Sequence, residues 1–199
     1  MKKFDRLPPE QRKAEIQSAA LHLFNEKGFA STTMENIVEQ VSLSKGGVYR
    51  LYPSTIAILS DLMVEGMRLR NAEYEDRVRQ ETEQGQTLTV QFLIEMIADS
   101  LLLYPEISSV YVEFLWEKQR RPELETLYRE ICSETVEETA SLMKKYGADD
   151  VLISGSVSLE RLTELMNAAI LSLRVLNLNQ FFAENKEQIC SSLLNLLKI

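Results

Sequence analysis

Apolar side chains recur every three or four residues through most of the chain, which is the spacing of one face of an α-helix. The first such stretch is residues 9–27, where Ile16, Ala20 and Leu23 share one side and Gly28 follows as a typical helix-ending glycine. No alternating, β-like pattern of useful length occurs, and the chain shows no internal repeat. We therefore predict an all-α protein.

Two short helices are predicted after the first. Thr32 or Thr33 opens the second helix, and Thr32 with Glu35 has the spacing of a capping box. Ser44 can cap the third helix after a tight turn, and Pro53 ends it. Two short helices joined by a tight turn are typical of a helix-turn-helix unit.

The rest of the chain reads as longer amphipathic helices. A long helix from Ser54 to about Arg79 directly follows the short ones, and residues 80–87 read as a loop. Further helices are predicted from Val90 to Tyr104, where Pro105 stops the pattern, and over Ile107–Arg120, about 124–146, 159–176 and about 182–197, with a loop at 148–156.

The segment 159–176 has the most regular pattern, because a second apolar row (Leu165, Ala168, Val175) runs beside the main one. A helix that is apolar on two sides needs two partners, so we expect one of them to be a second subunit. The alternative is that this helix and the last one only complete the core of the monomer. The predicted dimer interface consists of Leu159, Leu162, Met166, Ala169, Leu173, Leu176, Leu193 and Leu197.

Charge is divided unevenly between the two parts of the chain. Overall the 199 residues carry a net charge of −8, which at first argues against a nucleic-acid partner. Residues 1–55, however, carry a net +2 and residues 56–199 a net −10. A slightly basic head on an acidic body fits a DNA-binding domain whose body avoids the phosphates.

Motifs for catalysis are missing from the sequence. There is no phosphate-binding glycine loop, no G-x-S-x-G and no metal-ligand spacing of histidines and cysteines. The single histidine, His22, points away from the apolar stripe of its helix and is interpreted as a surface residue. We therefore expect neither an enzyme nor a cofactor or metal site. The absence of a signal peptide, the two unpaired cysteines and the lack of a long apolar run favour a cytoplasmic protein without a membrane span.

The stretch 44–53 carries side chains suited to DNA. Lys45 and Arg50 can reach a phosphate or a guanine edge, and Tyr49 can donate to a phosphate or pack on a thymine methyl. The pair Gly46–Gly47 lowers helix propensity but lets the backbone approach a groove closely. The alternative is an ordinary surface helix with two incidental glycines.

Three segments of the head together resemble the TetR-type transcriptional regulators. They are A-L-H-L-F-N-E-K-G at Ala20–Gly28, T-T-M-E-N-I at Thr32–Ile37 and S-K-G-G-V-Y-R-L-Y-P-S at Ser44–Ser54. The resemblance implies a helix-turn-helix DNA-binding domain over residues 1–55 and a helical effector-binding and dimerisation domain over 56–199, joined by a long helix. By motif position it also implies a DNA-contacting set of Thr33, Ser44, Lys45, Gly46, Gly47, Tyr49 and Arg50.

The implied function is that of a ligand-responsive regulator, a repressor by expectation. It would bind a pseudo-palindromic operator in double-stranded DNA as a homodimer and leave it when a small hydrophobic effector binds. Four positions depart from the family pattern: Ser42 replaces a usual turn glycine, Leu51 a frequent histidine, Thr55 a phosphate-holding lysine, and Ile56 a polar residue. The changes at Leu51 and Thr55 remove expected phosphate contacts and so predict weaker, less salt-sensitive binding.

The effector site is less legible in the sequence. Aromatic and methionine side chains on the body helices suit an adaptable apolar pocket, but equally a plain core. The candidates are Phe92, Met96, Tyr111, Phe114, Trp116, Tyr128, Met143 and Met166. If one of the acids Glu95, Asp99, Glu113 and Glu117 faces inward, a lipophilic cation is favoured as the effector. If none of them faces inward, a neutral or acyl ligand is favoured. The alternatives to a regulator are an enzyme or a protein-interaction module that uses this helical body.

Overall fold

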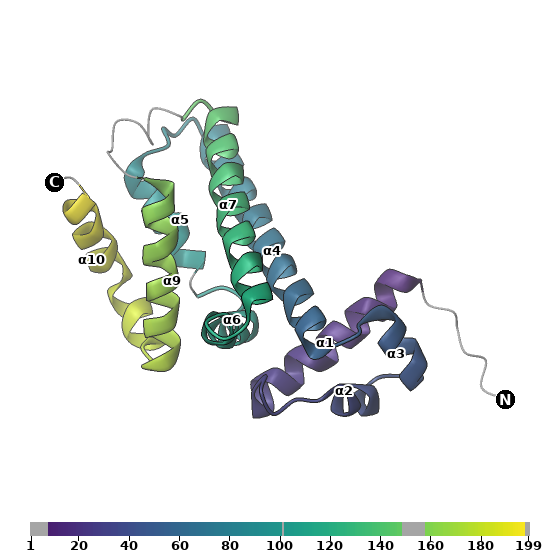
Figure 1. Ribbon diagram of the computed structural model, residues 1–199. Coiled ribbons are helices and arrows are strands. Elements are labelled where there is room, and N and C mark those ends of the chain that lie inside the picture. Colours follow the sequence, from purple (N-terminus) through teal and green to yellow (C-terminus); the bar gives the residue numbers. More distant parts are fainter. Residues whose placement is uncertain (1–7, 101, 149–157, 198–199) are drawn as a thin grey trace.

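A computed structural model describes residues 8–100, 102–148 and 158–197, and all regular structure in these ranges is α-helical, as predicted. Three helices form a head: α1 (Pro9–Lys27), α2 (Met34–Gln40) and α3 (Lys45–Leu51). The body consists of α4 (Thr55–Glu83), α5 (Val90–Ser100), α6 (Pro105–Glu117), α7 (Pro122–Lys145), α9 (Leu159–Val175) and α10 (Asn179–Leu197). Figure 1 shows the head at one end, α4 leaving it alongside α7, and α9 with α10 on the far side of the body.

Helix caps explain where the head helices begin and end. Gly28 follows α1 with φ +86°, a left-handed conformation that glycine adopts without strain. Ser44 and Ser54 cap α3 and α4 as predicted, each accepting a hydrogen bond from a backbone N–H three residues on. The capping box of α2 was misplaced by one residue.

The true capping box pairs Thr33 with Asn36. The Thr33 hydroxyl accepts from the Asn36 N–H (3.2 Å), and the Asn36 side chain accepts from the Thr33 N–H (3.0 Å). Thr32 is instead buried and donates to the carbonyl of Gly28 at 2.9 Å. Both threonines have the right spacing for a cap, and burial of Thr32 decides between them.

Pro105 begins α6 and does not end the helix before it. We predicted that Pro105 stops the preceding helix near Tyr104, whereas α5 ends at Ser100 and Pro105 occupies the first turn of α6. A proline fits there because the first-turn N–H groups have no partner within the helix. Tyr104 before it has φ +48°, a left-handed conformation uncommon for a residue other than glycine. Helix α4 runs to Glu83, about one turn beyond the prediction, and the loop prediction from residue 149 on lies outside the described residues.

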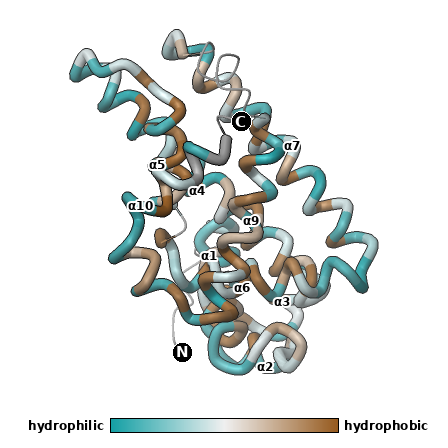
Figure 2. The backbone as a smooth tube through the Cα atoms, turned by 90° about the vertical axis from the view of Figure 1, so that its left-hand side faces the viewer, coloured by the Kyte–Doolittle hydropathy of each residue, from teal (hydrophilic) through white to brown (hydrophobic). Residues whose placement is uncertain are grey.

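The core is continuous from the head into the lower body. One cluster of buried residues extends from Ile16 on α1 through Ile58 on α4 to Phe114 on α6 and Ile131 on α7. Two further clusters fill the upper body, one around Tyr74 and Met143, the other between α5, α9 and α10. Apolar segments accordingly recur along each helix in Figure 2. The domain boundary at residue 55 stays a prediction.

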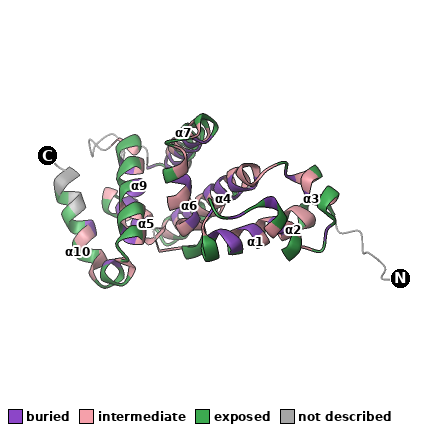
Figure 3. Cartoon of the chain, turned by 60° about the horizontal axis from the view of Figure 1, so that its bottom comes forward, coloured by how far each residue is buried: buried purple, intermediate pink, exposed green. Residues whose placement is uncertain are grey.

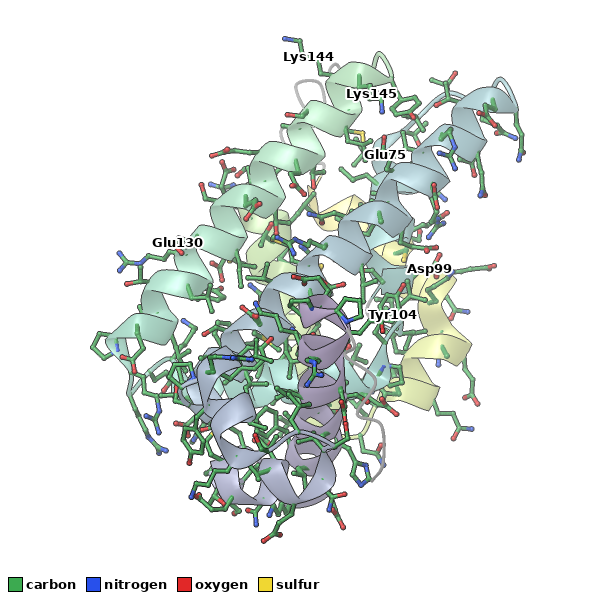
Figure 4. The ribbon with its side chains drawn as sticks, turned by 90° about the vertical axis from the view of Figure 1, so that its right-hand side faces the viewer. Glu75, Asp99, Tyr104, Glu130, Lys144 and Lys145 are labelled. Atoms are coloured by element: carbon green, nitrogen blue, oxygen red, sulfur yellow. The ribbon has the colours of Figure 1, made fainter. Side chains whose placement is uncertain are left out.

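Polar contacts add to this connection between head and body. The Asn25 side chain on α1 donates to the carbonyl of Glu106 on α6 (3.2 Å), and the Glu113 carboxylate accepts from the Phe29 N–H after α1. At the other end of the body, Lys145 of α7 pairs with Glu75 of α4, and both are labelled in Figure 4. Helices α4 and α6 are thus the body helices that hold the head.

Candidate DNA-binding site

Two buried side chains fix the inner face of α3. Val48 is fully buried and Tyr52 is 2% exposed, so both face the head core. The Tyr52 hydroxyl also donates to the carboxylate of Asp61 on α4 at 2.8 Å. Helix α3 is therefore held against α4 by packing and by a hydrogen bond, and its opposite face is directed outward.

The outer face of α3 carries the predicted DNA-contacting side chains. Lys45 and Arg50 are exposed and Tyr49 is half-buried. A Cβ atom added to Gly46 would meet nothing within 4 Å, so packing in the protein does not require glycine there. A Cβ on Gly47 would lie 3.3 Å from the Ser44 hydroxyl that caps α3. The open backbone at Gly46 leaves room for an approaching partner.

The structure thus brings six of the seven predicted residues together on α3 and its cap. Thr33 lies apart at the N-cap of α2, where its exposed side chain bonds to Asn36. The seven DNA-contact assignments stay predictions.

Glu35, expected as the capping-box partner of Thr32, lies instead among these side chains. The Glu35 carboxylate on α2 accepts hydrogen bonds from Lys45 Nζ (2.9 Å) and from the Tyr49 hydroxyl (3.1 Å). The bond from Lys45 lowers the pKa of the Glu35 carboxyl, and the same contact raises the pKa of Lys45. Ten residues separate Glu35 from Lys45, and only the fold makes them neighbours. Glu35 thus engages two of the candidate DNA-contacting side chains in the free protein.

Three of the four departures from the family pattern have a structural reason. Leu51 and Ile56 are half-buried and pack against the head core, so their apolar side chains add to its stability. Ser42 replaces glycine in the turn, and its N–H and hydroxyl both donate to the Glu15 carboxylate of α1. Nothing in the structure explains Thr55.

A narrow cleft of about 70 Å³ lies inside the body, between the helices that hold the head and α9. Its lining includes Met63, Met67 and Arg70 of α4, Ile107 and Tyr111 of α6, and Met166 of α9. A Cβ on Gly66 would come within 2.9 Å of Ile107 Cγ2, so glycine permits the close approach of α4 and α6 here. A larger groove of about 560 Å³ on the outer side of α4 and α7 is lined mainly by charged and polar residues such as Glu75 and Lys145, which pair with each other.

Two of the eight predicted effector residues, Tyr111 and Met166, line the narrow cleft between α4, α6 and α9. Phe114 is fully buried in the lower core, and Met96 and Met143 are buried in the upper body with Phe92 packed against them. Trp116 corrects the prediction, because it is 59% exposed on the surface of α6, with the Arg120 guanidinium 5.7 Å from its ring.

The four acids that bear on the effector charge are all engaged elsewhere. Asp99 pairs with Arg77 at 2.8 Å and with Lys186, and Glu117 pairs with Arg121 at 2.9 Å. Glu95 accepts from Gln91, and Glu113 accepts from the backbone after α1. None of them lines the narrow cleft. These four acids therefore give no support for a cationic effector in the narrow cleft.

A buried polar chain joins three body helices. The Tyr111 hydroxyl donates to the Asn167 side chain (2.9 Å), which donates to the Tyr128 hydroxyl (2.9 Å), which in turn donates to Glu164 (3.3 Å). Burial raises the pKa of both tyrosines and of the neighbouring Cys132 thiol. These groups therefore stay protonated near neutral pH and tie α6, α7 and α9 together, which is a poor basis for nucleophilic or acid–base chemistry.

The predicted dimer face needs correction at three positions. Leu162, Met166 and Leu173 are 5–6% exposed, buried by their own chain against α5 and its neighbours. Leu159 and Ala169 are half-buried, and the side chains of Leu193 and Leu197 lie outside the description. The regular stripe of α9 thus faces its own subunit, because α5 and α10 already supply its partner surface.

The second apolar row of α9 remains uncovered. In that row Leu165 is 47% and Val175 68% exposed. Beside it Leu176, a predicted dimer residue that directly follows α9, is 64% exposed, and Phe181 at the start of α10 is 57% exposed. Figure 3 shows such exposed residues on α9 and α10, at the end of the body away from the head. Isolated exposed leucines are ordinary, but several on neighbouring turns form an apolar surface that indicates a partner.

The described ranges contain neither a cluster of metal-binding side chains nor a membrane-spanning helix. They contain no group of three or more histidine, cysteine, aspartate or glutamate side chains placed to hold a metal ion. None of the helices in those ranges is both long and apolar enough to cross a membrane.

The head matches a known family. Residues 16–62 match the model of the "Bacterial regulatory proteins, tetR family". Over 58 residues the chain is 40% identical to the uncharacterized HTH-type transcriptional regulator YfiR of Bacillus subtilis, and this match spans 29% of the chain and 28% of that relative.

Solved structures resemble the whole chain at low identity. GusR of Salmonella enterica is 18% identical with a TM-score of 0.68, and the match covers 96% of each chain. The fatty acid degradation regulator FadR of Bacillus halodurans is 14% identical with a TM-score of 0.69, over 96% of this chain and 97% of that one. FadR of Thermus thermophilus, a TetR-family repressor solved with lauroyl-CoA, is 24% identical with a TM-score of 0.60, over 92% of this chain and 93% of that one. These likenesses show the fold of head and body together.

Proposed function

We propose that this chain, a TetR-type protein by its N-terminal domain and fold, is a transcriptional regulator that binds operator DNA through α3. The observation that carries the proposal is the division of α3 into two faces. Val48 and Tyr52 anchor the inner face, while Lys45, Tyr49 and Arg50 lie on the outer one. A rigidly backed helix with cationic and hydroxyl groups outward suits insertion into the major groove.

DNA would have to displace an internal contact in order to bind. A phosphate oxygen that reaches Lys45 and Tyr49 takes the place of the Glu35 carboxylate, which bonds to both in the free protein. The exchange replaces one anion by another at the same donors, so its cost is small for an exposed pair. Glu35 would then be repelled by the phosphates and turn away.

The regulator would act as a homodimer with one α3 in each half of a pseudo-palindromic site. Two recognition helices fit successive major grooves when they lie about 34–36 Å apart. The exposed row formed by Leu165, Val175 and Leu176, continued by Phe181, supports a two-fold contact built from α9 and α10. Residues 1–55 would read DNA, and residues 56–199 would dimerise and bind the effector.

The effector would bind in the narrow cleft between α4, α6 and α9. Only residues 52–54 separate α3 from α4, and α6 contacts the head through Asn25 and Glu113, so widening the cleft moves both supports of the head. A ligand that prefers the widened state shifts the dimer away from the spacing that DNA requires. We infer that binding releases DNA, which makes the protein a repressor with an effector of largely apolar character.

A regulatory role is favoured over an enzyme or a protein-interaction module. The buried tyrosines and Cys132 have raised pKa values, which is unsuited to acid–base or thiolate catalysis at neutral pH. The proteins that the chain resembles are named as regulators. A salt-dependent gel shift would separate this role from that of a protein-docking head, which makes no phosphate contacts.

The test is a gel shift with DNA from upstream of the protein's own gene. Lys45→Ala and Tyr49→Ala are each expected to abolish the shift while the dimer persists in sedimentation. Lys144→Ala is the matched control, because Lys144 is exposed at the end of α7 far from the head (Figure 4). Normal shifts by both α3 variants would show that α3 is not the reading helix.

A further inference from the structure

The narrow cleft contains the charged side chain of Arg70, which a purely apolar pocket would not need. It is the only charged residue in the lining as described. Its Nη2 donates to the Thr135 hydroxyl (2.7 Å) and, at 3.4 Å, to the side chain of Asn71. Both acceptors are neutral. Its Nε atom is buried and has no acceptor among the described residues.

The other arginines of α4 differ from Arg70 in their partners. Arg68, Arg77 and Arg79 each pair with a carboxylate, those of Glu65, Asp99 and Asp76 in turn. No described carboxylate forms an ion pair with Arg70, although it is the arginine of the helix that lines the narrow cleft. Arg70 is half-buried, and a positive charge that is partly withdrawn from water gains from an anion brought to it.

The remaining polar groups of the cleft have little left to offer a ligand. The Ser100 hydroxyl bonds to the Ile97 carbonyl and to the Tyr74 hydroxyl. The Ser108 hydroxyl donates to the carbonyl of Leu103, and the Tyr111 hydroxyl donates to Asn167. Apart from the Tyr104 hydroxyl, which belongs to an exposed side chain, the unused hydrogen-bonding capacity of the cleft is therefore concentrated on the Arg70 guanidinium.

The other walls of the cleft are apolar and adaptable. Met63, Met67 and Met166 contribute three unbranched side chains, which can change rotamer at low cost. The branched apolar residues of the lining are Leu103, Ile107, Ile131 and Ile170. The present volume of about 70 Å³ accepts only a slim group, so a ligand has to enter by moving these methionines. Tyr104, with its left-handed backbone, stands at the edge of the cleft in the turn between α5 and α6 (Figure 4).

We propose that this cleft binds a lipophilic carboxylate. The carboxylate accepts hydrogen bonds from Arg70, including its buried Nε, and the hydrocarbon chain lies among the methionines. A guanidinium and a carboxylate match in charge and in geometry. A thioester or an amide offers no charge at that end, and a cation is repelled. The inference rests on the proposed function in taking the cleft as the effector site, but the binding itself can be measured without DNA.

The experiment compares ligands that differ only in charge. Calorimetric titration of the full chain uses straight-chain carboxylates from butyrate to dodecanoate, with octanamide as the neutral match of octanoate and octyltrimethylammonium as the cation. We expect at least one carboxylate to bind, and octanoate to bind more tightly than octanamide by about tenfold or more, which is the scale of one charged hydrogen bond. Equal binding of octanoate and octanamide, tighter binding of the cation, or no binding by any carboxylate would overturn the proposal.

Variants then assign the selectivity to Arg70. Arg70→Met is expected to lower octanoate binding to the octanamide level and to leave octanamide binding unchanged. Arg79→Met removes an exposed arginine of the same helix outside the cleft and should keep the full selectivity. If Arg70→Met does not fold, Arg70→Gln serves instead, while the wild-type ligand series stands without any variant. Retention of selectivity in the folded variant would contradict the role of Arg70.

The two proposals fail in different ways. If octanoate binds selectively through Arg70 but no DNA is shifted by the protein, the anion site holds and the regulatory function is wrong. If operator DNA is bound and the carboxylates do not bind, the regulator stands and the anion site is wrong.

Discussion

The head and the body of this protein differ in how their sites are built. The outer face of α3 comes from seven consecutive residues, and its support from Val48 and Tyr52 in or next to the same short stretch. The narrow cleft of the body is lined by residues of α4, α6, α7 and α9, which together span more than a hundred positions of the sequence, from Met63 to Ile170. A site made from one helix is visible in sequence, whereas a site made from several is visible only after folding.

The two regions are nevertheless continuous in packing. The lower core runs from Ile16 on α1 to Ile131 on α7, and Phe114 of α6 lies fully buried within it. A movement of α6 or α4 is therefore transmitted to the head directly, without a flexible joint. Substitutions in the shared core, on the exposed surface of α9 and at Glu35 can test whether head and body share their stability and whether dimer formation and DNA binding are coupled.

The largest effect is expected from the shared core. Phe114→Ala should lower the free energy of unfolding by about 3–5 kcal/mol, because it leaves a cavity among residues of α1, α4 and α7. Head and body should still unfold in one transition by circular dichroism. Trp116→Ala, two positions away on the exposed side of α6, should change the stability little. Two separate transitions in Phe114→Ala would show that the head folds on its own core.

The next effect concerns the uncovered row of α9. Leu176→Glu places a charge on a side chain that is 64% exposed in the monomer, so the monomer should fold normally. If that row is the dimer contact, burial of an unpaired charge should weaken the dimer by about a hundredfold in sedimentation, and operator binding should fall with it. Thr126→Glu, on the exposed side of α7, is the control. An unchanged dimer in Leu176→Glu would move the interface elsewhere.

The smallest effect is expected at Glu35. Glu35→Gln removes the carboxylate that competes with DNA for Lys45 and Tyr49, and it should strengthen operator binding roughly two- to fivefold, the scale of an exposed ion pair. Fluorescence anisotropy at fixed salt measures it. Glu39→Gln, exposed at the end of the same helix, controls for the general loss of a negative charge. Weaker binding by Glu35→Gln would mean that Glu35 positions the two side chains instead of competing for them.

Local signals in the sequence predicted the head well. The end of α1 at Gly28, the caps at Ser44 and Ser54, and the burial of Val48 and Tyr52 all follow from rules that involve residues within one or two turns. Pro105 and Thr32 were misread because each has two permitted roles, and the choice depends on packing that the sequence does not display. The same holds for Glu35, which reaches α3 only through the fold.

The body was predictable in its helices but not in its surfaces. On α9 two apolar rows run side by side, and the sequence cannot say which row its own subunit covers. The more regular row, with Leu162 and Leu173, turned out to be the buried one. Trp116 and Phe114 are two residues apart and both aromatic, yet one is exposed and one fully buried. Arg70 stands out on α4 because none of the described carboxylates pairs with it, and only the three-dimensional arrangement reveals this.

The most direct test of the central claim is a dimethyl sulfate protection experiment on operator DNA. It reports on guanine N7 atoms in the major groove, where α3 is proposed to lie. We predict two protected patches related by a dyad and separated by about one helical turn, roughly 10–10.5 base pairs, and their loss in Tyr49→Ala. A single patch, protection confined to the minor groove, or an unchanged pattern with Tyr49→Ala would contradict the account.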